Sequence, residues 1–425
     1  MSNKEERPTL AGVNVKTRKR NIVVPSDPGS FADAIVQIFL DAADEGAPLE
    51  KNLEAGCKVL ESADLDFSRY ADTLFEVLFA GGRLATGGNL ADDEKEKLGT
   101  NILACESNPE AIMPFVKIFQ LLIRRRPFLV KGLESTMNKF ILSLEFYNED
   151  GRKKIATTAA LVFVNKLALP ENVLPTLLND RLVAKGTVLD FITTFFQVYL
   201  SKESLDDLKT MLTKAKMAAR LEELMPPGKR GEADFRAHFG AAGLAPLVEW
   251  NTQREVDAKL AELREELSKM MEDDPPMPVA DIISMVKSRK SEQNLPDAEV
   301  VRVIWSCLMR SINMTGKNQQ QILQSIVRGI KTYHKLLAAY VTNGRLELTL
   351  LVTVQVACYE DNRLLKLFTD VVKAMYSSDL VAEDTIQHWY KRGSHPKGRN
   401  VFLKDVEPFI KWLEEAEEED DEDDE

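Results

Sequence analysis

Apolar side chains recur every three or four residues along most of the chain, which is the spacing of one face of an α-helix. The first such run follows Ser30, the expected N-cap, and places Phe31, Ile35 and Phe39 on one face. Strict alternation of polar and apolar residues, the pattern of a half-buried strand, is nearly absent. Further helices are predicted over residues 49–62, 67–80, 110–125, 129–147, 152–166, 186–200, 203–224, 244–271, 279–290, 296–312, 318–341, 345–359, 362–376, 380–391 and 401–416.

Many helices joined by short breaks, with no sheet, predict an all-α fold of stacked helical pairs, a HEAT- or MIF4G-like helical-repeat solenoid. The prediction depends on helix lengths and spacing, because no sequence repeat of about 40 residues is visible. One stretch, LTLLVTVQV at 348–356, is rich in β-branched residues and would also suit a strand. Its helical flanks favour a buried helix.

The chain has 425 residues, which is too long for one ordinary domain. No helix can continue through PPGKRG at 226–231, so we expect two helical units with a hinge between them. A second break, DDPPMP at 273–278, is either another boundary or a loop inside the second unit. The predicted organisation is a flexible basic arm (1–28), an N-terminal HEAT-like domain (29–226), a hinge (227–243), a C-terminal domain (244–416) and a disordered acidic tail (417–425).

Charge changes this picture only at the C-terminus. Every residue from 414 to 425 except Ala416 is Asp or Glu, and these eleven carboxylates account for all but one unit of the formal net charge of −12. Such a block attracts Lys- or Arg-rich proteins and repels nucleic acid and anionic membranes. It cannot fold on itself, because its charges repel one another.

No motif for catalysis, a metal or a cofactor is present. The four cysteines are widely spaced, which indicates a reduced protein with thiols in the core, and we expect it in the cytoplasm. The four histidines lack metal-ligand spacing, and no phosphate-binding loop occurs. MSNKEERPTL is not a signal peptide, and no apolar run approaches about 18 residues, the length needed to span a membrane. We therefore expect a non-enzymatic protein without a cofactor.

The basic cluster KTRKR at 16–20 precedes leucine-rich helices, as in a basic leucine zipper. A zipper needs one continuous helix, and Pro25 and Pro28 interrupt the chain directly after the basic residues. DNA binding by this route is not expected. The cluster is instead interpreted as a flexible arm, and contact with an acidic protein, contact with RNA and a nuclear address all remain open.

Tryptophans stand beside acidic residues near the C-terminus. Trp412 is expected at the margin of an apolar helix face, next to the acidic block, and Trp389 shares a face with Ile386 and Tyr390. Either tryptophan could be core or rim at this stage, whereas Trp305 is expected in the core. A partner segment with lysines interleaved with apolar residues would suit both the acids and the exposed indoles.

Several segments together are highly specific. PTLAGVNVKTRKR (8–20), RYADTLFEVLFAGG (69–82), KIFQLLIRRRPFL (117–129), VQVACYEDN (354–362), AEDTIQHWYKR (382–392) and VFLKDVEPFIKWLEEAEEE (401–419) resemble the basic leucine zipper and W-two domain proteins, also called initiation factor 5-mimic proteins. The resemblance covers nearly the whole chain. It implies two HEAT-like units, the second being the W-two domain found at the C-terminus of initiation factor five.

The resemblance also implies a partner-binding site made of two aromatic–acidic boxes. The residues that match the first box are Glu347, Tyr359, Glu360 and Asp361. Those that match the second box are Glu383, Asp384, Trp389, Tyr390, Glu407, Trp412, Glu414, Glu415, Glu417, Glu418 and Glu419. The implied partners are the lysine-rich tail of the initiation factor two beta subunit, initiation factor three and other components of preinitiation complexes.

The chain has no counterpart of the GTPase-activating domain of initiation factor five, so the implied role is a competitor that tunes start-codon selection. A second hypothesis is a HEAT-type RNA or helicase scaffold acting through the N-terminal domain. Its support is IRRRPF at 123–128 together with KTRKR at 16–20.

Overall fold

The structure is a computed structural model that describes residues 9–10, 13–14, 27–85, 87–91, 97–273 and 277–423, with side chains up to Glu415. Most of the expected arm (1–28), including KTRKR, lies outside the described residues. Within the arm, strand β1 (Thr9–Leu10) pairs antiparallel with strand β2 (Val13–Asn14). Apart from this pair and one isolated bridge between Leu84 and Leu90, the described secondary structure is helical, which confirms the all-α prediction.

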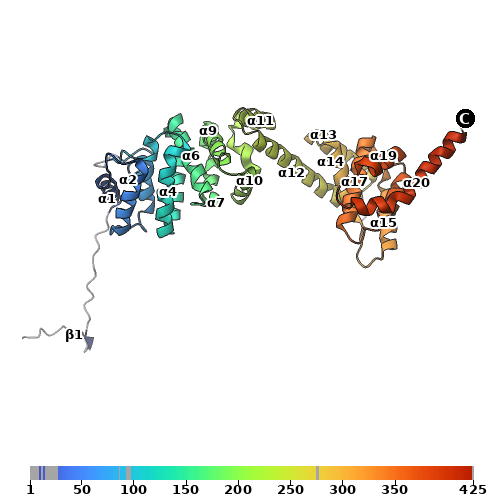
Figure 1. The fold of residues 1–425 in the computed structure, drawn as a ribbon, viewed down its shortest axis with the longest axis horizontal. Coiled ribbons are helices and arrows are strands. Elements are labelled where there is room, and N and C mark those ends of the chain that lie inside the picture. Colours follow the sequence, from blue (N-terminus) through green and yellow to red (C-terminus); the bar gives the residue numbers. More distant parts are fainter. Residues whose placement is uncertain are drawn as a thin grey trace, which may run out of the picture. The chain divides into compact units, whose positions relative to one another are not determined.

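The chain divides into two compact units, residues 1–249 (unit 1) and 250–425 (unit 2) (Figure 1). Unit 1 contains α1 (Pro28–Asp41), α2 (Leu49–Ser62), α3 (Ala71–Ala80), α4 (Pro109–Arg125), α5 (Leu129–Leu142), α6 (Glu149–Val164), α7 (Pro170–Val173), α8 (Asp180–Ala184), α9 (Thr187–Leu200), α10 (Leu205–Lys214) and α11 (Glu232–Ala241). Short 3-10 turns accompany them: η1 (Ile102–Ala104), η2 (Leu144–Phe146), η3 (Leu174–Leu178), η4 (Ala218–Leu224) and η5 (Pro227–Lys229). Helix α12 (Ala245–Glu272) contains the point of division.

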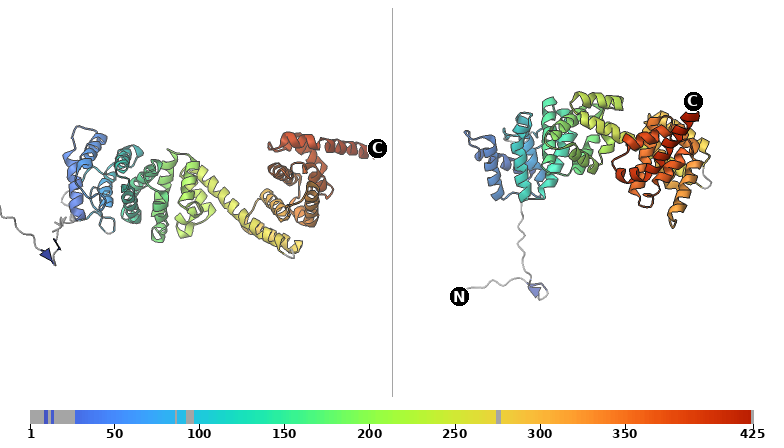
Figure 2. Two further views of the ribbon diagram at one scale, coloured as in Figure 1. Left: turned by 90° about the horizontal axis from the view of Figure 1, so that it is seen from below. Right: turned by 45° about the vertical axis from the view of Figure 1, so that its right-hand side comes forward.

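The helices of unit 1 stack in two layers. Helices α1, α3 and α5 follow one another in one layer, and α2, α4, α6 and α9 follow one another in the second (Figure 2). Between the layers lie packed phenylalanine rings: Phe79 stacks on Phe119 at 5.5 Å and on Phe140 at 4.9 Å between centroids. This is the arrangement of stacked helical pairs that the helix spacing predicts.

The segment expected as a hinge, residues 227–243, is largely helical. Helix α11 buries Phe235 and Phe239, and the Phe239 ring lies 6.0 Å from that of Phe196 on α9. The side-chain amide of Gln197 also donates to the backbone carbonyl of Ala242 at 2.9 Å. The prolines and glycines stop the preceding helix, but the aromatic residues that follow attach α11 to unit 1.

Unit 2 is a second helical bundle. It contains most of α12, then α13 (Val279–Gln293), α14 (Asp297–Ser311), α15 (Gln319–Thr332), α16 (His334–Tyr340), α17 (Gly344–Glu360), α18 (Phe368–Tyr376), α19 (Glu383–His388), the π-helical turn η6 (Trp389–Gly393) and α20 (Arg399–Asp423). Both described sides of the 273–278 break belong to this unit, so the break is a loop within it. Residues 348–356 lie inside α17, which confirms that this β-branched stretch is helical.

The end of α20 differs from the expected boundary. The helix continues to Asp423, so the structure does not place a change from helix to tail at residue 416 or 417. The side chains of Glu417, Glu418 and Glu419 lie outside the described residues.

Candidate functional site

Trp389 is a core residue in this structure. Its side chain is 1% exposed, and its ring packs 5.2 Å from that of Phe368. Its indole Nε1 donates to Oε1 of Gln355 at 3.0 Å. An indole can be buried in this way when its N–H finds an acceptor. Of the two alternatives that the sequence left open, the structure shows the buried one, so Trp389 cannot itself contact a partner in this conformation.

Gln355 connects three segments around Trp389. It is completely buried on α17, and its Oε1 also accepts from the backbone N of His395 at 3.0 Å. Its Nε2 donates to the carbonyl oxygens of His395 and Lys397, both at 2.8 Å. The residue therefore positions the loop after η6 beside the C-terminal end of α17, where three of the first-box residues lie.

Glu347, near the start of α17, holds the beginning of α19. Its Oε2 accepts from the backbone N of Ala382 at 2.8 Å and from Oγ1 of Thr385 at 2.7 Å. Ala382 is the N-cap residue of α19 and has no capping side chain of its own, so Glu347 supplies the missing acceptor. The same contact brings Glu347 close to Glu383 and Asp384, the first two second-box residues.

Tyr359, Glu360 and Asp361 form a group at the other end of α17. Tyr359 is 44% exposed, and the edge of its ring meets Phe402 of α20 at 6.4 Å. Glu360 pairs with Lys397 at 2.6 Å. The hydrogen bonds from the Arg363 side chain hold the pKa of Asp361 below its usual value.

Trp412 is the exposed indole of this unit. It is 52% exposed, stacks on Phe409 at 5.8 Å and meets the edge of the Tyr376 ring at 6.3 Å. The ten residues between Phe402 and Trp412 span about 15 Å of helix, so Trp412 is well separated from the Tyr359 group. The structure therefore does not gather the two boxes into one site.

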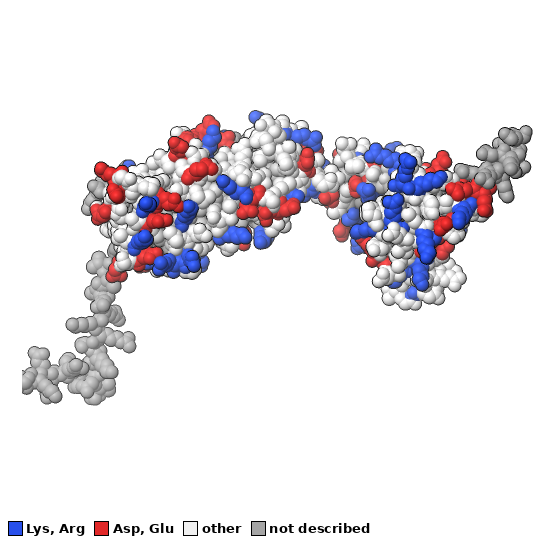
Figure 3. Space-filling view, in the orientation of Figure 1, with Lys and Arg blue, Asp and Glu red and all other residues white. Residues whose placement is uncertain are grey.

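The acids of α20 differ in their surroundings. Glu407 pairs with Lys411 at 3.0 Å, whereas Glu414 and Glu415 are exposed beyond the last buried residue of the helix, Leu413. In the face of unit 2 that Figure 3 shows, Lys and Arg are spread over the surface, and acidic side chains gather where α20 leaves it. Tyr390, the remaining second-box residue, is half-buried against the core.

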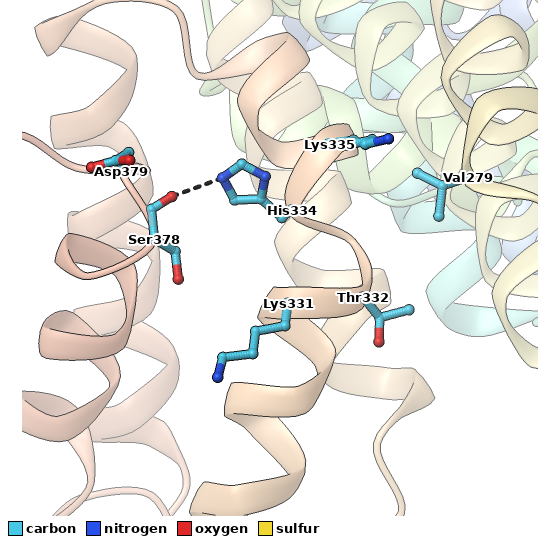
Figure 4. Close-up of a pocket in the computed structure, with 7 residues that line it drawn as sticks. All are labelled: Val279, Lys331, Thr332, His334, Lys335, Ser378 and Asp379. Atoms are coloured by element: carbon cyan, nitrogen blue, oxygen red, sulfur yellow. Dashed lines mark hydrogen bonds between the residues drawn. The ribbon is translucent and has the colours of Figure 1, made fainter.

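Two hollows open on unit 2. The first, of about 490 Å³, is lined by Lys331 and Lys335 at the junction of α15 and α16 (Figure 4). Nε2 of His334 donates to the carbonyl oxygen of Ser378 across it at 2.7 Å. Asp379 is the acid that lines it, against two lysines and a histidine, so its charge does not suit a basic segment.

The second hollow, of about 400 Å³, lies between α14 and α17. Its lining includes the half-buried side chains of Val352 and Val356, and the first-box residue Glu360. Reasoning from the two boxes missed the valines. The signal was the apolar excess of 348–356, which is more than a helix needs to bury one face.

No chemistry for catalysis is apparent in the part of the chain that the structure describes. Among these residues no group of three His, Cys, Asp or Glu side chains could hold a metal ion. Burial raises the pKa of the Cys57 thiol to about 11 and that of Cys358 to about 12, so neither is an activated nucleophile. None of the described helices has the length and apolar character needed to cross a membrane.

Comparison with known proteins agrees with the resemblance seen in the segments. A family model of the 5MP1/2 HEAT domain matches residues 15–261, and the W2 model, described as eIF4-gamma/eIF5/eIF2-epsilon, matches residues 346–423. A HEAT-like domain followed by a W2 domain is thus confirmed. These ranges overlap the predicted domains (29–226 and 244–416), whose bounds stay predictions.

Three relatives show how much of the chain is shared. The chain is 34% identical to eIF5-mimic protein 2 of Gallus gallus over 421 residues, which are 99% of this chain and 98% of the relative. It is 34% identical to eIF5-mimic protein 2 of Homo sapiens over 98% of this chain and 97% of the relative. It is 32% identical to eIF5-mimic protein 1 of Mus musculus over 98% of both chains. The chain therefore belongs to the eIF5-mimic protein family.

Proposed function

We propose that this chain is a non-enzymatic regulator of translation initiation, whose unit 2 binds basic segments of initiation factors in the cytoplasm. The proposed partners are the lysine-rich tail of the initiation factor two beta subunit and initiation factor three. By occupying them, the chain competes with initiation factor five and alters start-codon selection. Its relatives are named for mimicry of initiation factor five, and the W2 domain carries that factor's name.

One observation carries the proposal: the exposed indole of Trp412 stands directly before a run of carboxylates. Glu414 and Glu415 are exposed, and nine further residues with eight Asp or Glu among the last nine positions but none basic follow Ala416 in the sequence. Charges of this kind speed association and are screened over about 8–10 Å at physiological salt. The indole adds contact area at short range, where aromatic residues dominate binding energy.

The exposed ion pairs of the site do not oppose this role. Glu360 with Lys397 and Glu407 with Lys411 are both exposed, and such pairs contribute only about 0–1 kcal/mol. A lysine from a partner can therefore take the place of the chain's own lysine at little cost.

The RNA scaffold hypothesis loses support in unit 1. Arg125 pairs with Glu61 at 3.2 Å, and Arg126 donates to the carbonyl of Glu61 while its guanidinium lies 4.4 Å from the Phe67 ring centroid. Two of the three arginines in IRRRPF thus hold α4 against its neighbours rather than forming a free basic patch.

The test is a pull-down of the purified lysine-rich tail of the factor two beta subunit by the immobilised chain. Leu413 is fully buried, so the truncation must begin after it. We expect a chain that ends at Ala416 to lose most of the binding at low salt. A full-length chain with Asp and Glu changed to Asn and Gln over 417–425 serves as the matched variant and should lose it equally. Binding that survives both changes would refute the proposal.

A further inference from the structure

The hollow between α14 and α17 is an open groove with an apolar wall. On α17, Val352 and Val356 stand one turn apart, and Glu360 follows one turn later on the same side. On α14, Trp305 and Met309 face them. The groove therefore presents a strip of apolar surface that ends at a carboxylate.

Helix α17 carries more apolar surface than its own unit covers. Leu350, Leu351 and Val354 are fully buried in the core, while Val352 and Val356 are only half-buried. A helix that is apolar around most of its circumference is normally covered on all sides. An apolar strip that remains open and has a polar rim marks an interaction site.

Charge decides what chemistry fits the groove. Glu360 is the acid that lines it, and Arg302 at the opposite wall is already paired with Glu299. Glu360 is held only by the exposed pair with Lys397, whose side chains are 57% and 53% exposed. A segment that places an aliphatic side chain between the helices and a lysine beside Glu360 would satisfy both features.

We propose that this groove receives the apolar side chains of a lysine-rich partner segment, while the acidic C-terminus attracts its lysines. The groove's volume of about 400 Å³ lies in the range of pockets that bury small ligands. The inference rests on the proposed function and assigns it a specificity surface: buried Trp389 contributes no contact, and the groove supplies the short-range recognition instead.

Two synthetic peptides separate the groove from the acidic block. Both have the same number of lysines; one interleaves them with leucines and the other with serines. The intact full-length chain should bind the leucine peptide about tenfold more tightly, as expected for one or two buried apolar side chains. The double variant Val352→Ser/Val356→Ser should bind the two peptides equally, because it keeps the charges and loses the apolar wall.

The controls distinguish the two ideas. Val59→Ser changes an exposed valine of α2 in unit 1 and should leave the preference unchanged. Truncation after Ala416 should weaken the binding of both peptides and keep their ratio. If the double variant keeps the tenfold preference, the groove proposal is overturned while the proposed function stands. If the intact chain binds neither peptide, both fail.

Two further measurements guard against a trivial result. Val356→Phe fills the groove without removing apolar surface and should also abolish the preference, so misfolding of the serine variant alone cannot explain the outcome. The indole N–H resonance of Trp305, whose Nε1 has no hydrogen-bond partner among the described residues, should shift on addition of the leucine peptide only. Sedimentation that shows a dimer lost in the groove variants would assign the surface to a second copy of the chain and overturn the proposal.

Discussion

At the scale of single residues, buried polar groups of unit 2 explain why the candidate site has its observed form. Gln355 satisfies the indole of Trp389 and the backbone of His395 and Lys397 at once. A fully paired buried network of this kind fixes one arrangement of its segments. Trp389 and Glu347 match the aromatic–acidic boxes by residue type, yet in the structure they organise the fold around the exposed residues.

Replacing Gln355 should therefore destabilise unit 2. Gln355→Ala leaves the indole N–H, one backbone N–H and two carbonyls without their partner, and we expect a loss of about 3 kcal/mol in the free energy of unfolding. Urea unfolding followed by tryptophan fluorescence measures it. Gln324→Ala, at an exposed position of α15, is the matched control and should change the stability by less than about 0.5 kcal/mol. Equal effects of the two variants would contradict the role given to Gln355.

At the scale of elements, α11 belongs to unit 1 through contacts that depend on pH. Its His238 lies 2.8 Å from Oγ1 of Thr193 on α9, and burial lowers the pKa of His238, with Lys229 acting in the same direction and Asp190 opposing it. Because the folded state favours the neutral imidazole, the unfolded state binds more protons in this range. This contribution to stability is present above the ordinary histidine pKa and is lost as the pH falls.

Acidification should thus loosen α11 before the rest of unit 1. Between pH 7 and pH 5.5 we expect the amides of α11 to lose protection in hydrogen exchange, after correction for the intrinsic exchange rate. His238→Gln removes the titrating group and should make the protection of α11 nearly independent of pH over this interval. The same pH dependence in both proteins would show that another group is responsible.

The helices show where sequence patterns suffice and where they do not. The period of apolar residues predicts α2 and α17 closely, including the β-branched stretch, because packing decides their conformation. Capping was assigned one turn late: Asp27 rather than Ser30 caps α1, and it accepts the backbone N–H of Ser30 at 2.9 Å, with Pro28 at the start of the helix. The helix expected over 318–341 is interrupted at Tyr333, between α15 and α16.

The candidate site was less accessible to such reasoning. Composition locates the acidic block, and the exposure of Trp412 agrees with a place at the margin of its helix. The burial of Trp389 depends on an acceptor, Gln355, that lies 34 residues earlier in the chain. The groove depends on how α14 and α17 meet. Both are tertiary features that no local pattern contains.

At the scale of the whole molecule, the chain pairs a helical-repeat unit with a W2 unit whose negative charge is concentrated at its very end. Its net charge of −12 comes almost entirely from the last twelve residues, so the remainder is close to neutral and does not repel basic factors or attract them strongly. The proposed competition with initiation factor five therefore depends on a short segment that can be removed without touching the buried Leu413.

The most direct measurement is a displacement titration. A fluorescently labelled lysine-rich tail of the factor two beta subunit is bound to initiation factor five, and its anisotropy is followed as this chain is added at low and at physiological salt. The account predicts that the intact chain displaces factor five, more effectively at low salt, and that the chain ending at Ala416 displaces little. Failure of the intact chain to displace factor five, or equal displacement by the truncated chain, would contradict it.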